Sequence, residues 1–360
     1  MPGKIKFYSK KRIIENYIKK YFRKIILFPI PDLIIKKIME RNYTDMGTEL
    51  SNGCNANCSF CAYRFQKRQR KVTNLEMFKK AIDNYSSDGG GTVSFTPVIG
   101  DPLIDKKIIE KFNYCMSKPN INSVYLYTNG IFLDNYDMHK FLTSGLNRLA
   151  ISIFFGSREL YKKYFGVDQY DRVIKNIKDI ARINNDNDYN VKITLHLRVE
   201  MPEEKWNTNP DFLEIRDLVG EKNISYKADY ENWSGMIKDS DLPAGCTLGE
   251  TPNFEEKNSV PCWELYRKVY VMSDSSVGVC PSRDMEGEIN IGDLKKNTLK
   301  EIWQGDKIKK FRDDWKKGIL PNVCKNCDRY ESIDSYIKKK KYTIFRTQVL
   351  KRILKLDHFS

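Results

Sequence analysis

Short apolar runs and longer amphipathic segments alternate along residues 46–228. A short apolar run between turn residues predicts a strand, and apolar residues at every third or fourth position predict a helix. The expected strands are 46–50, 92–96, 123–127, 148–153, 190–199 and 224–228, and the expected helices lie near 73–84, 104–117, 136–144, 158–165, 170–184 and 210–219. This alternation predicts an α/β fold in which six parallel strands form an open, partial (β/α)6 barrel of the TIM type, with chemistry at the carboxyl ends of the strands.

The pattern changes after residue 245. Two short apolar runs, 270–274 and 277–279, predict a β-hairpin, which a short strand and a helix follow. We therefore expect a small C-terminal domain of hairpin and helix beside the barrel. The expected division of the chain is an N-terminal arm at 1–44, a core at 45–245, the small domain at 246–332 and a tail at 333–360.

The net charge of +15 is concentrated near the two ends of the chain. Residues 1–42 contain 12 Lys or Arg and 3 Asp or Glu, residues 331–360 contain 8 and 3, and the rest is close to neutral. Basic arms of this kind suit an anionic lipid surface or a polyanion better than they suit a basic catalytic groove. Because no aromatic and basic RNA-reading motif accompanies them, nucleic acid is not an expected partner.

Residues 11–27 and 343–355 place apolar side chains opposite Lys and Arg. Helices of this type either lie on the periphery of an anionic membrane or pack on the barrel, and we favour packing. No apolar run approaches the roughly 20 residues that cross a bilayer. The basic start also lacks the apolar stretch and cleavage site of a signal peptide, so we expect a cytoplasmic protein.

Nine cysteines without an export signal make a disulfide framework improbable and favour metal or redox chemistry. Cys54, Cys58 and Cys61 place three thiols within eight residues, and none of the three histidines of the chain has ligand spacing with them. A structural zinc site needs four closed ligands. Three thiolates on a four-iron cluster would instead leave one iron free to bind a small molecule.

This Cys-x3-Cys-x2-Cys loop follows an expected strand and has an aromatic residue, Phe60, before its last cysteine. It resembles the signature of the radical S-adenosylmethionine (radical SAM) family. The resemblance implies that Cys54, Cys58 and Cys61 hold a [4Fe-4S] cluster whose free iron binds S-adenosylmethionine. It also implies that the backbone around Phe60 meets the adenine.

Three further strand ends resemble the family. Gly100 and Asp101 match a Gly-Gly-Glu-Pro segment that receives the amino group of S-adenosylmethionine, although Asp is one methylene shorter than Glu and a bridged contact is an alternative. Ser152 resembles a hydroxyl directed at the carboxylate or ribose. On the fifth strand, His196 and Arg198 share one face, and we assign Arg198 to the cofactor pocket.

A second set of thiols, Cys262, Cys280, Cys324 and Cys327, could close a zinc site or hold another iron-sulfur cluster. Their order around the expected hairpin resembles the C-terminal extension called SPASM, in its shortened "twitch" form. Because no cysteine follows Cys327, the resemblance implies one auxiliary [4Fe-4S] cluster. Cys246 is an alternative ligand or, as we favour, a free thiol.

The resemblance implies reductive cleavage of S-adenosylmethionine to a 5′-deoxyadenosyl radical that abstracts hydrogen from a substrate. The electron would come from a donor such as flavodoxin or ferredoxin. An auxiliary cluster suits an oxidation, so we expect an oxidoreductase, with no catalytic side chain singled out. About 45 residues precede the first strand, too few for a leader-binding module, which favours a small carbohydrate-like or carrier-bound substrate. The alternatives are a ribosomal peptide maturase, a non-catalytic iron-sulfur electron carrier and a zinc-stabilised binding protein.

Overall fold

The computed structural model describes residues 31–249 and 254–344. Its centre is a curved sheet in which the first six strands run parallel and in chain order, as the sequence predicts. Their bounds are β1 (Asp45–Thr48), β2 (Gly91–Phe95), β3 (Ile121–Thr128), β4 (Arg148–Phe154), β5 (Lys192–Arg198) and β6 (Ile224–Tyr226). The strand order of a partial, open (β/α)6 barrel is therefore confirmed.

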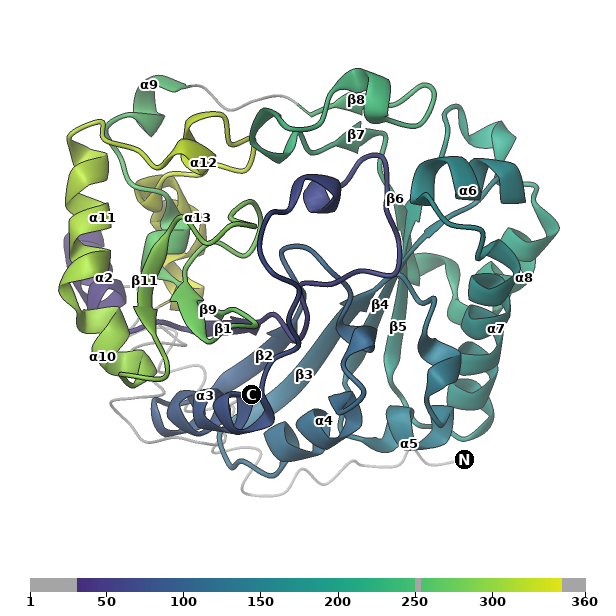
Figure 1. Cartoon of the computed structure of the whole chain (residues 1–360), viewed down its shortest axis with the longest axis horizontal. Helices are drawn as coiled ribbons and strands as arrows, with labels where there is room; N and C mark the ends of the chain where they lie inside the picture. The colour runs from purple at the N-terminus through teal and green to yellow at the C-terminus, as the bar shows by residue number, and fades with distance from the viewer. Residues whose placement is uncertain (1–30, 250–253, 345–360) are drawn as a thin grey trace, which may run out of the picture.

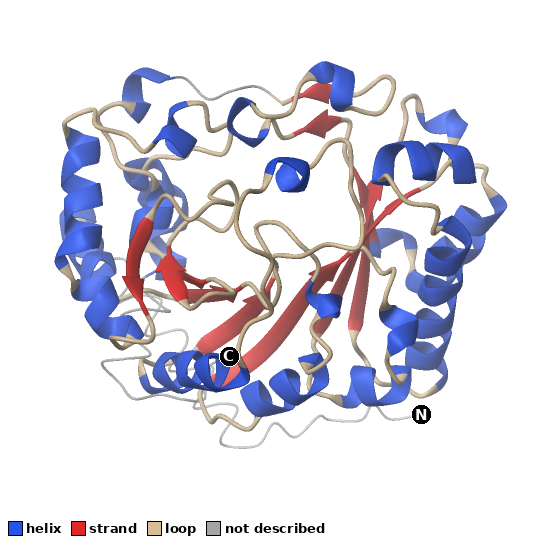
Figure 2. Cartoon of the chain, viewed as in Figure 1, coloured by secondary structure: helices blue, strands red, loops and turns tan. Residues whose placement is uncertain are grey.

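Helices cover the outer side of these strands (Figures 1 and 2). A polar side chain caps the start of α3, α5, α6 and α8; Asn74, for example, accepts hydrogen bonds from the backbone N–H groups of Glu76 and Met77. Apolar faces such as Val173, Ile177 and Ile180 of the longest helix are fully buried against the sheet. The helices are α3 (Leu75–Ser87), α4 (Ile108–Met116), α5 (Met138–Thr143), α6 (Arg158–Phe165), α7 (Tyr170–Asp186) and α8 (Pro210–Val219).

The predicted C-terminal hairpin is present, but it continues the barrel sheet. Strand β9 (Lys268–Val271) pairs in parallel with β1, and β10 (Ser276–Gly278) and β11 (Asn290–Asp293) extend the sheet further. The full order is β11-β10-β9-β1-β2-β3-β4-β5-β6. Gly47 makes the junction tight, because a Cβ atom there would lie 2.7 Å from the ring of Tyr270. The two halves therefore share one sheet.

A buried carboxylate ties the junction together. Glu49, which has no exposed surface, accepts hydrogen bonds from both terminal nitrogens of Arg68 at 2.8 and 3.1 Å. The backbone N–H and hydroxyl of Ser273 donate to the same carboxylate at 3.0 and 2.9 Å. The end of β1, where the cysteine loop begins, is thus fixed to the end of β9.

Helices surround this extension, whereas β7 and β8 form a separate two-stranded sheet. Helix α2 packs on α13, and Ile35, Met39, Ile333 and Ile337 are buried there. The bounds of these remaining helices and strands are α2 (Asp32–Arg41), β7 (Asp229–Tyr230), β8 (Thr247–Leu248), α9 (Phe254–Lys257), α10 (Leu299–Gln304), α11 (Asp306–Lys316), α12 (Asn322–Lys325) and α13 (Ile333–Ile344).

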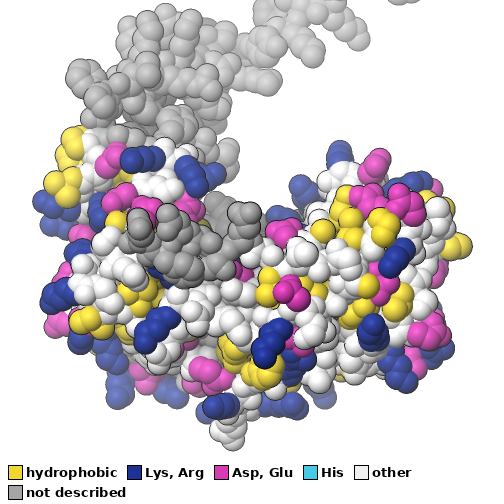
Figure 3. Space-filling view, turned by 90° about the horizontal axis from the view of Figure 1, so that it is seen from above, with side chains coloured by type: hydrophobic (Ala, Val, Ile, Leu, Met, Phe, Trp, Pro, Cys, Tyr) yellow, Lys and Arg dark blue, Asp and Glu magenta, His cyan; other side chains and the backbone are white. Residues whose placement is uncertain are grey.

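The amphipathic segment 11–27, and 343–355 beyond residue 344, lie outside the described residues. None of the helices in the described ranges is long and apolar enough to cross a bilayer. Figure 3 shows Lys and Arg interspersed with Asp and Glu over the visible face. Membrane contact and the three boundaries between the four expected segments stay predictions.

Candidate functional site

A cavity of about 420 Å³ opens at the carboxyl ends of the barrel strands. Strands β3 to β6, the loop after β2 and the cysteine loop after β1 form much of its wall. All the residues predicted for the first cluster and for the cofactor line it, namely Cys54, Cys58, Cys61, Phe60, Gly100, Asp101, Ser152 and Arg198. The structure therefore brings one complete set of predicted residues to one place, and their roles stay predictions.

Backbone contacts hold the cysteine loop in position. The N–H groups of Asn57 and Ser59 donate to the carbonyls of Phe165 and Tyr164 at the end of α6, each at 2.9 Å. Gly166 permits this approach, because it has a φ of +69° and a Cβ atom would lie 2.5 Å from the carbonyl oxygen of Asn57. The loop is therefore shaped by main-chain hydrogen bonds to a barrel helix.

Two of the three thiols of the loop receive N–H groups of the chain. Asn129 Nδ2 lies 3.7 Å from Cys54 Sγ, and the backbone N–H of Tyr63 lies 3.5 Å from Cys61 Sγ. Burial raises the pKa of all three thiols, and the neighbouring Cys61 and Cys54 raise that of Cys58 further. Such thiols lose their protons when they bind a metal, since coordination favours the thiolate.

The carboxylate of Asp101, which we predicted to contact S-adenosylmethionine, is hydrogen-bonded to other residues of the chain. Its buried carboxylate accepts hydrogen bonds from Leu103 N at 2.9 Å, Asn129 N at 2.8 Å and the Thr128 hydroxyl at 2.8 and 3.0 Å. Donors thus reach both oxygens, and the two oxygens share the single hydroxyl hydrogen of Thr128. Burial raises the pKa of Asp101, and the hydrogen bonds oppose that rise. Asp101 thus joins the loop after β2 to the end of β3 and orients Asn129 towards the thiols.

Arg198 lies across the cavity from this junction. Its guanidinium stands 5.5 Å from the ring centre of Phe60 and 5.2 Å from that of Tyr230. Its Nε atom has no hydrogen-bond partner among the described residues. The positive charge opposes the rise in the pKa of Cys58 and Cys61. Arg198 therefore supplies a cation and a free donor close to the cysteine loop.

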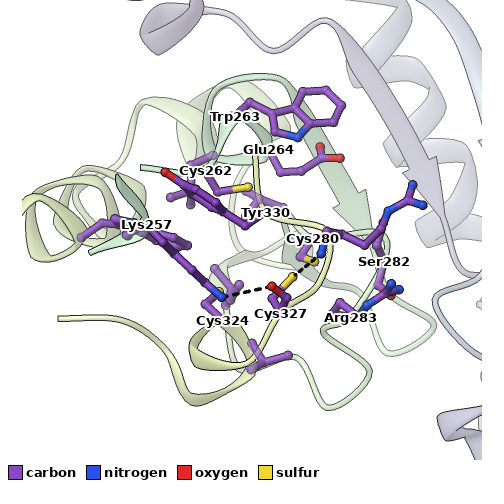
Figure 4. Close-up of a pocket in the computed structure, with 16 residues that line it drawn as sticks. Lys257, Cys262, Trp263, Glu264, Cys280, Ser282, Arg283, Cys324, Cys327 and Tyr330 are labelled. Atoms are coloured by element: carbon purple, nitrogen blue, oxygen red, sulfur yellow. Dashed lines mark hydrogen bonds between the residues drawn. The ribbon is translucent and has the colours of Figure 1, made fainter. Parts of the chain in front are cut away.

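The other four predicted thiols meet in a smaller cavity of about 60 Å³, which Figure 4 shows. Burial raises the pKa of all four, and that of Cys280 reaches about 12. The buried Lys257 donates to the carbonyls of Lys325 and Cys327 at 3.0 and 3.1 Å. The members are Cys262, Cys280, Cys324 and Cys327.

Two cysteines stand apart from these sets. The thiol of Cys246 donates to the carbonyl of Val199 at 3.3 Å, and this residue lines neither of the two cavities. Cys115 is fully buried in the core on α4, as expected of a small apolar residue.

Family models match both halves of this arrangement. The radical SAM superfamily model matches residues 48–213, and the SPASM model, described as an iron-sulfur cluster-binding domain, matches residues 262–328. The chain belongs to the radical SAM superfamily. The two matched segments contain the three thiols of the barrel cavity and the four of the smaller cavity, respectively.

Curated relatives match part of the chain. A probable GTP 3′,8-cyclase of Saccharolobus solfataricus is 29% identical over 138 residues, which are 38% of this chain and 44% of that relative. An uncharacterized protein of Methanocaldococcus jannaschii is 33% identical over 132 residues, 36% of this chain and 41% of its own. The matched segment thus spans less than half the length of these radical SAM relatives.

Solved structures share the fold. A crystal structure of BtrN in complex with AdoMet and 2-DOIA has a TM-score of 0.52 and 17% identity, with 81% of this chain and 96% of that chain covered. SuiB of Streptococcus suis, bound to precursor peptide SuiA, has a TM-score of 0.57 and 12% identity, with 90% and 86% covered. At these identities the likeness shows the fold alone.

S-adenosylmethionine and the [4Fe-4S] cluster that binds it are the cofactors of this family. The SPASM domain adds auxiliary iron-sulfur binding. Within the described ranges, no three His, Cys, Asp or Glu side chains approach as ligands of one metal ion would. The test of fit therefore rests on the donors. Both cavities offer thiols of the type that iron-sulfur clusters use, with N–H groups near several sulfurs, and these residues fit such clusters.

Several residues of the barrel cavity escape sequence reasoning. Tyr230 ends the short strand β7, Glu231 and Trp233 follow it, and Arg283 and Arg329 follow cysteines of the second set. No periodic pattern marks them. The one signal that could have suggested a shared wall between the cavities is that Arg283 lies close to Cys280 in sequence and Arg329 lies close to Cys327.

Proposed function

We propose that this radical SAM enzyme is an oxidoreductase that abstracts hydrogen from a small carbohydrate-like or carrier-bound substrate, with one auxiliary [4Fe-4S] cluster assisting the oxidation. When bound, the first cluster supplies the electron that cleaves S-adenosylmethionine, and the auxiliary cluster supplies a site for an electron from the substrate. Cys54, Cys58 and Cys61 would hold the former.

One observation carries this proposal: residues beside the auxiliary thiols also line the barrel cavity. Ser282 and Arg283 border both cavities, so a substrate in the barrel would lie next to the auxiliary site. The barrel cavity, at about 420 Å³, is within the range of about 300 to 1,000 Å³ that small-ligand sites occupy. This size supports a compact substrate.

The chain's own residues would position the reactants. Asp101 holds Asn129 and the loop after β2 against the cysteine loop, and Gly100 keeps the backbone close to it. We assign Phe60, Ser152 and Arg198 to the S-adenosylmethionine pocket, where apolar walls limit access of water.

A ribosomal peptide maturase is the second candidate. SuiB, which shares the fold, was solved with a precursor peptide, whereas BtrN was solved with 2-DOIA, so both substrate classes occur on this fold. A substrate screen with both classes separates these candidates, since deuterium from a labelled substrate would enter 5′-deoxyadenosine only with the correct class.

The deciding experiment measures 5′-deoxyadenosine after anaerobic cluster reconstitution, with dithionite and S-adenosylmethionine. We expect product from the wild-type chain and none from Cys58→Ala, because this thiol lines the open cavity. Cys246→Ala is the matched control and should keep full product, because Cys246 lines neither cavity. Wild-type protein that carries iron and sulfide but forms no product, with either substrate class present, would favour the electron-carrier hypothesis.

The partners follow from the same proposal. We propose a flavodoxin or ferredoxin as electron donor, which is tested by replacing dithionite with each reduced protein. Peripheral membrane contact by the basic arms is tested by co-sedimentation with anionic vesicles, and binding that survives deletion of both 1–30 and 345–360 would count against it.

A further inference from the structure

A shared wall separates the barrel cavity from the auxiliary cavity. Ser282, Arg283 and Arg329 line both, and Glu231 and Trp233 complete the barrel side. These residues lie directly after auxiliary cysteines or in the loop after β7. The wall is therefore built by the part of the chain that joins the two thiol sites.

Arg283 is the central residue of this wall, and it is only 3% exposed. Its Nε donates to Asp328 at 2.7 Å, its Nη1 donates to the carbonyl of Ser282 at 2.6 Å, and its guanidinium stands 5.1 Å from the ring centre of Trp233. Its buried Nη2 has no hydrogen-bond partner among the described residues. A buried guanidinium nitrogen without an acceptor is costly, which indicates a ligand acceptor at this position.

The charges around Arg283 are unequal. Glu231 is shared by Arg329 at 3.0 Å, Lys227 at 3.9 Å and Arg283 Nη2 at 4.0 Å, while Asp328 pairs with Arg283. Three cations thus face two acids at this wall, without counting Arg198, which we assign to the S-adenosylmethionine pocket. Asp101, the other acid of the lining, is already hydrogen-bonded within the chain. The surplus of positive charge favours an anionic group.

We propose that this wall is a binding site for an oxyanion of the substrate, a phosphate or a carboxylate, which accepts hydrogen bonds from Arg283 Nη2. Arginine suits such a group because its planar donors match paired oxygens. The inference rests on the proposed function, and it adds the substrate class: an anionic molecule held by its charged end between the two thiol sites.

The test is calorimetric titration of the anaerobically reconstituted full chain with inorganic phosphate and, separately, with malonate, at constant ionic strength and with saturating S-adenosylmethionine. We expect one site for at least one probe, and its identity tells a phosphate from a carboxylate. Arg283→Gln should weaken the Kd by about tenfold to hundredfold. Arg283→Lys, which keeps the charge without the fork, should weaken it less. The exposed Arg216→Gln is the matched control and should bind as the wild type does.

Iron content and thermal midpoint are measured for each variant. If Arg283→Gln loses its clusters, Arg329→Gln, which changes the more exposed side of the wall, replaces it in the titration. The proposal is overturned if neither probe binds, or if Arg283→Gln or its substitute binds as tightly as the wild type. It is also overturned if saturating S-adenosylmethionine abolishes binding, since the probe would then occupy a cofactor site. Formation of 5′-deoxyadenosine is measured in the same preparations. If it forms while neither probe binds, the anion site alone has failed; if it does not form, the proposed function has failed.

Discussion

The cysteine loop after β1 and the cysteine pocket of the C-terminal half differ in the number of thiols and in the space around them. Three thiols line a cavity of about 420 Å³, whereas four line one of about 60 Å³. Three ligands beside open space suit a cluster that must bind an exchangeable molecule. Four ligands in a small cavity suit a closed site, and they support a single auxiliary cluster.

The two sites also differ in how the protein places its cations. At the barrel site, Arg198 lines the cavity, and its buried Nε atom has no hydrogen-bond partner among the described residues. At the auxiliary site, Lys257 directs its donors to the carbonyls of Lys325 and Cys327. A cation that already binds the backbone stabilises a loop, and a cation with a free donor is available to a ligand. Lys257 therefore holds the auxiliary loop, whereas Arg198 and, on the wall shared by both cavities, Arg283 each keep one nitrogen without a partner among the described residues.

The largest expected effect comes from removing a thiol of the closed site. Cys324→Ala should lose roughly half of the bound iron, because each [4Fe-4S] cluster holds about four iron atoms. It should still form 5′-deoxyadenosine with dithionite, because its thiol lies outside the barrel cavity. Iron, sulfide and product are measured together. Loss of all iron in Cys324→Ala would show that the sites do not fill independently.

The second prediction concerns the junction between the sites. Glu49→Gln should destabilise the fold by about 3 to 5 kcal/mol, because Arg68 then lacks its buried partner. The readout is the thermal midpoint together with iron release. Since Glu49 joins β1 to β9, both sites should lose iron at the same lowered temperature.

The matched control for this junction is Glu76→Gln, a surface carboxylate on α3 with one weak ion pair to Lys79 at 3.7 Å. It should change stability by no more than about 0.5 kcal/mol. If Glu49→Gln released iron from the auxiliary site alone, the two halves would be less firmly connected than their shared sheet implies.

Sequence reasoning succeeded where the signal is local. Strand and helix order follows from periodicity, so the parallel barrel was predictable from the sequence. Cysteine spacing also grouped the seven thiols that line the two cavities, and their role as ligands stays a prediction. The pairing of β9 with β1 joins Met46 to Val269, and no local pattern encodes a contact across such a separation. The shared sheet was therefore missed.

The candidate site was predictable to the same extent. The positions of Phe60, Gly100 and Ser152 at strand ends and in the cysteine loop placed them in one cavity. What Asp101 contacts was not predictable, because its partners Thr128 and Asn129 belong to another strand end. A residue type at a strand end indicates position in the site, but its partner depends on the neighbouring strand.

The third prediction tests this use of Asp101. In Asp101→Asn an amide NH₂ replaces one carboxylate oxygen, so the N–H of either Leu103 or Asn129 loses its acceptor. The expected loss of stability is about 1 to 3 kcal/mol, with weaker binding of S-adenosylmethionine. Thermal midpoint and equilibrium binding check it. Asp137→Asn, at the exposed N-terminus of α5, is the control, since Asn also caps helices well.

The smallest expected effect is a pH dependence that belongs to the barrel cavity alone, because no His is among the described residues that line the auxiliary cavity. Burial lowers the pKa of His196 to about 4, helped by the positive charges of Arg148, Arg198 and Lys227. The unfolded chain, with an ordinary His pKa of about 6.5, then binds more protons between pH 6.5 and 4, so stability falls as the pH falls through that window.

Allowing for its partial exposure, we expect His196 to account for about 1 kcal/mol by pH 5. His196→Gln should flatten this part of the thermal midpoint profile, and the exposed His139→Gln should leave it unchanged. If the thermal midpoint varied with pH equally in the wild type and His196→Gln, the ring would have the same pKa in the folded and the unfolded chain. The barrel cavity around it would then be as hydrated as the surface.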